Sequence, residues 1–240
     1  MEIDRNKEEK PEESPVETVL VLQGGGSLGA YECGVYKTLV KHNIKFDIVS
    51  GTSIGSLNAA IITAHSHHSI ENSAKELENF WLDLTETLIP LPQQFASLYF
   101  TDEMRAVLAS IYSATYGNPK AFFPSWIVSG FLNYLQPFRL LPYPLFDITP
   151  LKKTLSRYVD FSKLRDLHRP RLIVTSTNIQ TSEPVVFDSK YTDIIADHVI
   201  ASAGFPFYGI AWTRIDNRYL WDGALLSNTP LREVIDASPT

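Results

Sequence analysis

The sequence contains a single cysteine and no long apolar run, and these absences exclude several classes of protein. Cys33 alone cannot form an intramolecular disulfide or a cysteine-based metal cluster, and we expect it to be a core residue of a helix. No stretch of about 20 apolar residues occurs, so we expect no membrane-spanning helix. The N-terminus is charged where a signal peptide would have an apolar core. These features predict a protein that is cytoplasmic or peripheral to a membrane.

The net charge is also small outside the N-terminus. The formal net charge is -6 at pH 7, and much of it comes from acidic residues within residues 1–17. We predict that residues 1–17 form a disordered charged leader and that residues 18–240 form one domain, which is long enough for a sizeable core. The rest of the chain is nearly neutral and has no basic stripe, so no nucleic-acid partner is expected.

The order of apolar patterns predicts an α/β fold. Residues 18–22 and 46–50 are predicted strands, and predicted helices follow them at residues 30–42 and 54–65. Two successive strand–turn–helix units are typical of a mainly parallel central sheet flanked by helices. Further helices are predicted around residues 77–84, 151–159 and 191–202, and further strands at residues 171–177 and 184–187.

Residues 85–146 differ from their surroundings because they are rich in proline and aromatic residues and poor in charge. This composition is compatible with two interpretations of the segment. The segment is either a lid or interfacial patch for lipid, since Trp and Tyr suit an apolar–aqueous boundary, or an irregular layer that wraps the core. Trp126 and Phe131 are the residues whose replacement would separate these interpretations.

Residues 51–55 match the pattern G-x-S-x-G, with Ser53 at its centre. A predicted strand precedes the pattern and a predicted helix follows it, which is the context that a nucleophile elbow requires. The chain passes close to itself at such a turn, so Gly51 and Gly55 leave space that side chains would fill. The start of the following helix directs free N–H groups toward the serine. A glycine-punctuated turn with an N-cap serine is the alternative.

Residues 24–29 form a glycine-rich loop at a predicted helix N-terminus, which is typical of an anion site. Gly24, Gly26 and Gly29 also match the dinucleotide pattern G-x-G-x-x-G, so a nucleotide-binding fold competes. Asp47 lies about 20 residues further on, where a ribose-binding acid would be sought. Asp47 lies at the start of a predicted strand, whereas a ribose-binding acid would lie at the end of one. Ser53 follows the end of that same strand. This placement favours acyl transfer.

A catalytic serine also needs a base, and Asp222 is the candidate. No histidine follows Asp222, so the acid–histidine order of α/β-hydrolases is absent. A partly desolvated carboxylate has a raised pKa and can act as the base itself. The alternative is that Asp222 and Gly223 form an ordinary turn.

The histidines predict no metal site. His65 and His68 have i, i+3 spacing, but they lie at the predicted end of a helix, where solvated side chains are expected. His198 is expected to be a packed helix residue.

Together, these motifs resemble the patatin-like phospholipase family. The resemblance rests on residues 24–29, residues 51–55 and the Asp222, Gly223, Ala224 element, in this order, supported by residues 201–206 and 228–230. It implies a three-layer patatin-like fold, a lipid or phospholipid substrate with peripheral membrane contact, and no cofactor. It also implies Ser53 as nucleophile, Asp222 as base, and an oxyanion hole formed by the loop amides at Gly24, Gly25, Gly26 and Ser27.

The sequence departs from the family pattern at two places. Many members have Arg or Lys at the position of Leu28, so the loop of this chain lacks a positive charge that they carry. The chain also ends soon after Pro230, where a patatin domain usually continues with a strand, so we expect a shortened C-terminal end. The alternatives to a serine lipid acyl hydrolase are a catalytically silent lipid-binding protein of this fold and a dinucleotide-binding protein.

Overall fold

The computed structural model describes residues 16–67, 69–85, 101–125, 144–166 and 168–238. Its first half contains β1 (Val19–Leu22), α1 (Gly29–Lys41), β2 (Ile48–Thr52), α2 (Ile54–His65), α3 (Ile70–Thr85), α5 (Asp102–Tyr116) and β3 (Phe123–Pro124). Its second half contains β4 (Phe146–Asp147), α7 (Thr149–Tyr158), β5 (Arg171–Asn178), β6 (Glu183–Asp188), α8 (Ala196–Ala203), β7 (Thr213–Ile215), β8 (Arg218–Asp222) and α9 (Leu231–Ala237). Short 3-10 turns η1 (Gly26–Leu28), η3 (Phe161–Lys163), η4 (Pro206–Tyr208) and η5 (Gly223–Leu225) complete the chain.

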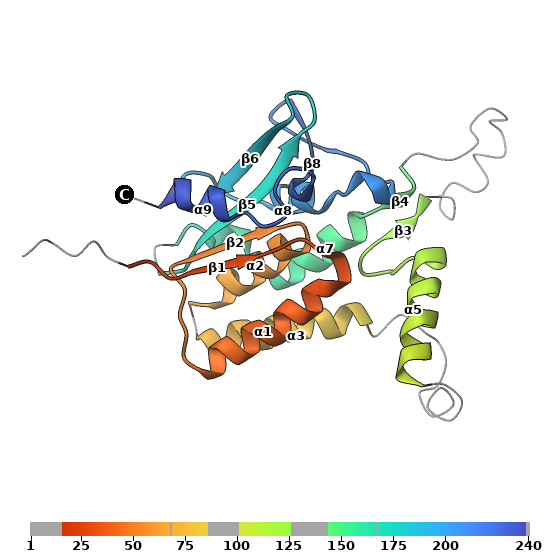
Figure 1. The fold of residues 1–240 in the computed structure, drawn as a ribbon, viewed down its shortest axis with the longest axis horizontal. Helices are drawn as coiled ribbons and strands as arrows, with labels where there is room; N and C mark the ends of the chain where they lie inside the picture. The colour runs from red at the N-terminus through yellow and green to blue at the C-terminus, as the bar shows by residue number, and fades with distance from the viewer. Residues whose placement is uncertain (1–15, 68, 86–100, 126–143, 167, 239–240) are drawn as a thin grey trace, which may run out of the picture.

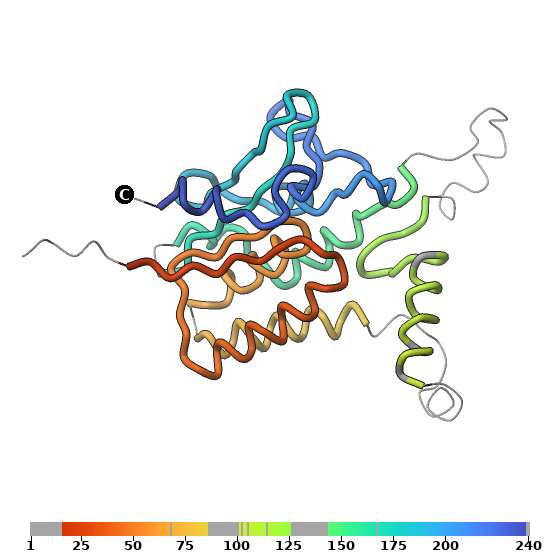
Figure 2. The backbone as a smooth tube through the Cα atoms, viewed as in Figure 1, coloured from red at the N-terminus to blue at the C-terminus, as the bar shows by residue number. Residues whose placement is uncertain are grey.

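A six-stranded sheet forms the centre of the molecule, and helices flank it (Figure 1). Strands β1, β2 and β5 are parallel to one another. Strands β6 and β8 pair antiparallel with β5, and β7 pairs antiparallel with β8. The backbone returns from β1 through α1 along one side of the sheet, as Figure 2 shows. The predicted α/β class with a flanked central sheet is confirmed.

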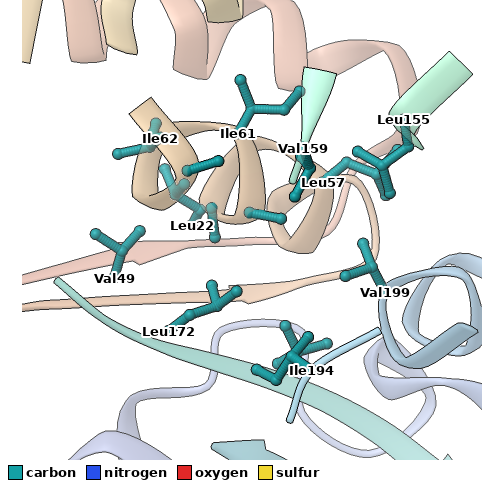
Figure 3. Packing of buried hydrophobic residues seen from close by; sticks show 14 of the residues in the cluster. Leu22, Val49, Leu57, Ile61, Ile62, Leu155, Val159, Leu172, Ile194 and Val199 are labelled. Atoms are coloured by element: carbon teal, nitrogen blue, oxygen red, sulfur yellow. The ribbon is translucent and has the colours of Figure 1, made fainter. Parts of the chain in front are cut away.

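One face of the sheet packs against the helices that follow β1 and β2. Leu22, Val49 and Leu172 are buried on the strands and belong to the same apolar cluster as Leu57 and Ile61 of α2 (Figure 3). Burying one such side chain contributes about 1.5–3 kcal/mol relative to leaving it exposed. This cluster holds α2, and therefore the turn that precedes it, against the sheet.

The opposite face carries the residues that alternate with these. Ile48 and Ile173 are buried next to Val234 of α9, in a separate apolar cluster. Successive side chains of a strand point to opposite faces, so the short apolar runs at residues 48–49 of β2 and 172–174 of β5 serve both layers. Helices thus cover both faces of the sheet, which gives the expected three layers.

Most predicted elements are present, with small shifts of their ends. The helix expected from residue 191 begins at Ala196 as α8, and the strand expected at residues 46–50 is β2, which begins at Ile48. Within residues 85–146, residues 86–100 and 126–143 lie outside the described part, so Trp126 and Phe131 do too. The described part contains a regular element that the sequence analysis did not identify, the 15-residue helix α5. Among the described residues, none of the helices is both long and apolar enough to cross a membrane.

Candidate active site

The register of the sheet brings Ser53 and Asp222 together although they are far apart in sequence. Thr52, the last residue of β2, pairs with Thr175 of β5. Asp222, the last residue of β8, pairs with Ser176, the next residue of β5. The carboxyl ends of β2 and β8 therefore meet at consecutive positions of one strand. Ser53 follows Thr52 directly, so it lies at the junction.

Ser53 occupies a sharp turn between β2 and α2. Its φ is 56° and its ψ is -128°, in a region that residues other than glycine rarely adopt and that costs about 1–3 kcal/mol. Its amide donates to the Oγ of Ser202, a buried residue of α8, at 2.9 Å. Its carbonyl accepts from the Oγ of Ser56 at 2.6 Å. Two side chains thus hold the backbone of Ser53, whose own side chain is half-buried.

The glycines on either side of this turn occupy positions without space for a side chain. A Cβ on Gly51 would lie 2.2 Å from the carbonyl oxygen of Gly55. A Cβ on Gly55 would lie 2.4 Å from the carbonyl oxygen of Leu22 in β1. These contacts are with backbone, which cannot move aside. The turn at Ser53 therefore requires both glycines, as the sequence analysis expected.

Gly24 lies directly against Ser53 and is clamped by the C-terminal part of the chain. A Cβ on Gly24 would lie 2.9 Å from the Cβ of Ser53. The amide of Gly24 donates to the carbonyl of Asn228 at 3.1 Å, and the Nδ2 of Asn228 donates to the carbonyl of Gly24 at 3.2 Å. The Gly24 amide is therefore already used, and Gly24 positions the loop.

The next three loop residues carry the free amides. The N–H groups of Gly25, Gly26 and Ser27 have no backbone acceptor within the described part of the chain. Gly26 has a φ of +58° and opens the turn η1, and all three residues are exposed. N–H groups at the start of such a turn attract anions. Of the four residues expected to line an oxyanion hole, these three have amides without a backbone acceptor, and they follow Gly24, which lies against Ser53.

Asp222 is a fully buried carboxylate next to Ser53. Its Oδ1 accepts from the amide of Ala224 at 2.9 Å. Burial raises the pKa of Asp222 to about 6, and the neighbouring Ser53 hydroxyl and Ala224 amide oppose this rise. Its Oδ2 is buried and makes no hydrogen bond of regular geometry to any described residue. Gly223 follows where a Cβ would lie 2.6 Å from the carbonyl oxygen of Thr175.

A buried polar network supports the glycine loop from behind, and sequence analysis missed it. Asn58 of α2 donates through Nδ2 to the carbonyl of Gly29 at 3.0 Å and to Glu32 Oε2 at 2.9 Å. Trp81 Nε1 donates to Asn58 Oδ1 at 3.1 Å. Burial raises the pKa of Glu32, and Asn58 opposes this. An asparagine within the apolar run of α2 was the available signal, because buried polar groups need partners.

Asp47, His65 and His198, which the sequence analysis also considered, lie away from Ser53. Asp47 precedes β2 and accepts from the amide of Thr18 at 2.8 Å, at the opposite end of the strand from the glycine loop. His65 bonds through Nε2 to the carbonyl of Tyr158 at 2.7 Å, and His68 lies outside the described residues. His198 is buried, stacks on Phe187 and accepts from an amide. In the described ranges, no three metal-binding side chains gather.

Two hollows of about 800 and 700 Å³ lie elsewhere on the molecule. The first is lined by residues of β5, β6 and α9, including Arg171 and Asp236. The second lies near the amino ends of the strands, with Lys45 and Arg169 in its lining. Ser53 and Asp222 line neither of these two hollows.

Comparison with known proteins gives similar enzymes. The model of the family described as patatin-like phospholipase matches residues 20–235. The cGAMP-activated phospholipase of Vibrio cholerae is 24% identical over 88% of this chain and 55% of its own length. Lysophospholipase NTE1 of Meyerozyma guilliermondii is 36% identical over 34% of this chain and 6% of its own length.

The crystal structure of VipD from Legionella pneumophila is 18% identical, with a TM-score of 0.47 over 89% of this chain and 47% of that chain. The chain thus spans about half, or much less, of the length of these proteins. Because the family model matches residues 20–235, which is most of the chain, the chain belongs to the patatin-like phospholipase family.

Proposed function

We propose that the chain is a serine lipid acyl hydrolase that cleaves carboxylic esters, of the phospholipase A, lysophospholipase or lipase type. The observation that carries the proposal is the buried Asp222, with its pKa raised to about 6, beside the half-buried Ser53 at the start of α2. Family membership supports lipid acyl hydrolysis as the general activity.

In the first half-reaction, the Ser53 hydroxyl transfers its proton to Asp222 as Oγ attacks the ester carbonyl carbon. The carbonyl oxygen becomes the oxyanion of a tetrahedral intermediate, and the amides of Gly25, Gly26 and Ser27 donate to it. One well-placed donor of this kind lowers the activation free energy by about 3–4 kcal/mol. Protonated Asp222 then gives its proton to the leaving alkoxide, the ester C–O bond breaks, and an acyl ester on Ser53 remains.

In the second half-reaction, Asp222 takes a proton from water as the water oxygen attacks the acyl carbon. The same amides stabilise the second oxyanion. Asp222 returns the proton to Ser53 Oγ as the acyl–serine bond breaks, so the fatty acid leaves and the free enzyme is restored. A carboxylate with a pKa near the working pH suits both steps, because it must accept and release a proton in each.

Two other functions are weighed against this one. A dinucleotide-binding protein would need an acidic residue near the glycine loop, whereas Asp47 bonds at the other end of β2. A catalytically silent lipid-binding protein would keep the fold and leave Ser53 unreactive. Reactivity of Ser53 therefore distinguishes the enzyme from the silent lipid-binding protein.

The test uses a fluorophosphonate probe and a panel of lipid esters. The wild-type chain is expected to label at Ser53 and to hydrolyse at least one ester, and Ser53→Ala is expected to lose both. Asp222→Asn is expected to lose hydrolysis, while Asp193→Asn, at an exposed ion pair, keeps it. Undiminished turnover by Ser53→Ala would refute the proposal, and an unlabelled, inactive wild-type chain would favour the silent alternative.

A further inference from the structure

The helix α5 carries an apolar stripe that faces solvent. Met104, Val107, Leu108 and Ile111 follow i, i+3, i+4, i+7 spacing, and between 42% and 58% of each side chain is exposed. Such a stripe normally packs against the core of a protein. In Figure 1, α5 stands at the edge of the molecule, beyond the carboxyl ends of β1 and β2.

Further apolar side chains are exposed around the site itself. Leu28 and Tyr31 lie on the glycine loop and the start of α1. Phe207 and Tyr208 lie on η4, which follows α8. An exposed apolar set of this kind marks an interaction surface more often than single scattered residues do.

Backbone hydrogen bonds and a packing contact connect the site to α5. The amide of Asp222 donates to the carbonyl of Gly204 at 3.1 Å, which begins the segment that contains η4. The amide of Leu145 donates to the carbonyl of Gly209 at 2.7 Å, at the end of this segment. Leu145 precedes β4, which pairs with β3, and β3 contacts α5. The exposed apolar residues therefore belong to one end of the molecule.

This end of the molecule is also poor in charge. Residues 23–31, 106–119 and 204–212 contain no Asp, Glu, Lys or Arg. Charged residues such as Lys45, Asp47 and Arg169 lie instead near the amino ends of the strands. A protein or nucleic-acid partner would normally be matched by charge at the rim, whereas a lipid surface needs apolar and aromatic side chains.

We propose that this end of the molecule docks on a lipid bilayer, with the α5 stripe and the η4 residues Phe207 and Tyr208 inserted into the interface. The proposal rests on the proposed function, because a lipid ester would then pass from the bilayer to Ser53 across an apolar surface. The charged residues of α5 are confined to its first turn, at Asp102, Glu103 and Arg105. Docking therefore depends on apolar burial, and neutral phosphatidylcholine suffices as the surface.

The test is flotation of the chain with phosphatidylcholine vesicles. The double variant Val107→Ser/Ile111→Ser is expected to bind at least about tenfold more weakly, since two apolar side chains no longer enter the interface. Ile235→Ser on α9 is a matched control, because Ile235 is 61% exposed and Ile111 is 58% exposed. Binding by the wild-type chain is expected to change less than about twofold between low and high salt.

A second pair of variants tests the η4 region independently of α5. Tyr208→Ser is expected to weaken flotation, and Tyr191→Ser is the control, since these side chains are 64% and 67% exposed. Flotation measures docking without turnover, and hydrolysis of a soluble short-chain ester by the wild-type chain measures turnover without docking. Failure of the docking proposal is thus distinguishable from failure of the proposed function.

Several results would overturn the proposal. These are the absence of vesicle binding by the wild-type chain, equal binding by the variants, or binding only to anionic vesicles at low salt. A wild-type dimer that the α5 variant dissociates would assign the stripe to a second copy of the chain. A fall in Tm of more than about 5 °C that Ile235→Ser does not share would assign it to packing within the chain.

Discussion

As the pH rises, the buried carboxylate of Asp222 should make the folded chain less stable and the site more reactive. Burial raises its pKa from 3.8 to about 6, so the folded chain holds a proton there that the unfolded chain releases. The protonated carboxyl therefore contributes stability that is fully present below the unfolded pKa. This contribution is lost as the pH rises through about 6. One pKa unit corresponds to about 1.4 kcal/mol, so the cost at pH 8 is about 3 kcal/mol.

Asp222→Asn removes this ionisation and keeps the shape of the side chain. We expect the variant to be more stable than the wild-type chain by about 3 kcal/mol at pH 8, and by less than about 1 kcal/mol at pH 4. For a domain of this size, a gain of about 3 kcal/mol raises Tm by roughly 6–12 °C. The same variant should lose ester hydrolysis at every pH, because its amide cannot take the proton of Ser53.

The pH dependence of the wild-type activity should report the ionisation of the same carboxyl group. If Asp222 must be ionised, kcat/KM is expected to rise with pH through about 6 and to be about tenfold lower at pH 5 than at its plateau. Thermal unfolding of both chains at pH 4 and pH 8, with Asp193→Asn as the exposed control, measures the stability part. A variant that is less stable than the wild-type chain at pH 8, or an activity that is flat from pH 5 to pH 8, would refute the reasoning.

Three further perturbations test the turn at Ser53 and the fold around the sheet. Gly55→Ala places a Cβ 2.4 Å from a carbonyl oxygen and should cost several kcal/mol in urea unfolding, whereas Gly34→Ala, in open space within α1, should stabilise by about 0.5–1 kcal/mol. Ser202→Ala removes the acceptor of the Ser53 amide and should slow fluorophosphonate labelling about tenfold, with partial rescue by Ser202→Thr. Asp188→Ala leaves a nearly buried guanidinium unpaired and should lower the free energy of unfolding by about 3–5 kcal/mol, measured in urea.

Local features of the fold could be predicted because they depend on residues close in sequence. The turn at Ser53 needs a strand, two glycines and a helix within a short stretch, and the sequence displays all of them. The glycine loop was identified for the same reason. The use of the Gly24 amide could not be foreseen, because its acceptor is the carbonyl of Asn228, more than two hundred residues away.

Elements with weak or mixed patterns were missed. The helix α5 lies within a segment whose prolines and aromatic residues suggested irregular structure, although Asp102–Tyr116 contains no proline. Strands β7 and β8 have 3 and 5 residues, too few to show a clear alternation. Because β8 carries Asp222 to the sheet, its pairing was the long-range contact that the sequence could not supply.

The proposed mechanism uses no histidine, and the arrangement of the sheet gives a structural reason. In a triad, a histidine takes the serine proton, and the acid orients that histidine and stabilises its charged form. Here Thr52 and Asp222 pair with consecutive residues of β5, so the strands themselves bring the carboxylate beside Ser53. A carboxylate in water is too weak a base for this task, and burial at the same junction raises its pKa. One feature of the sheet thus supplies both the proximity and the basicity that a histidine would otherwise provide.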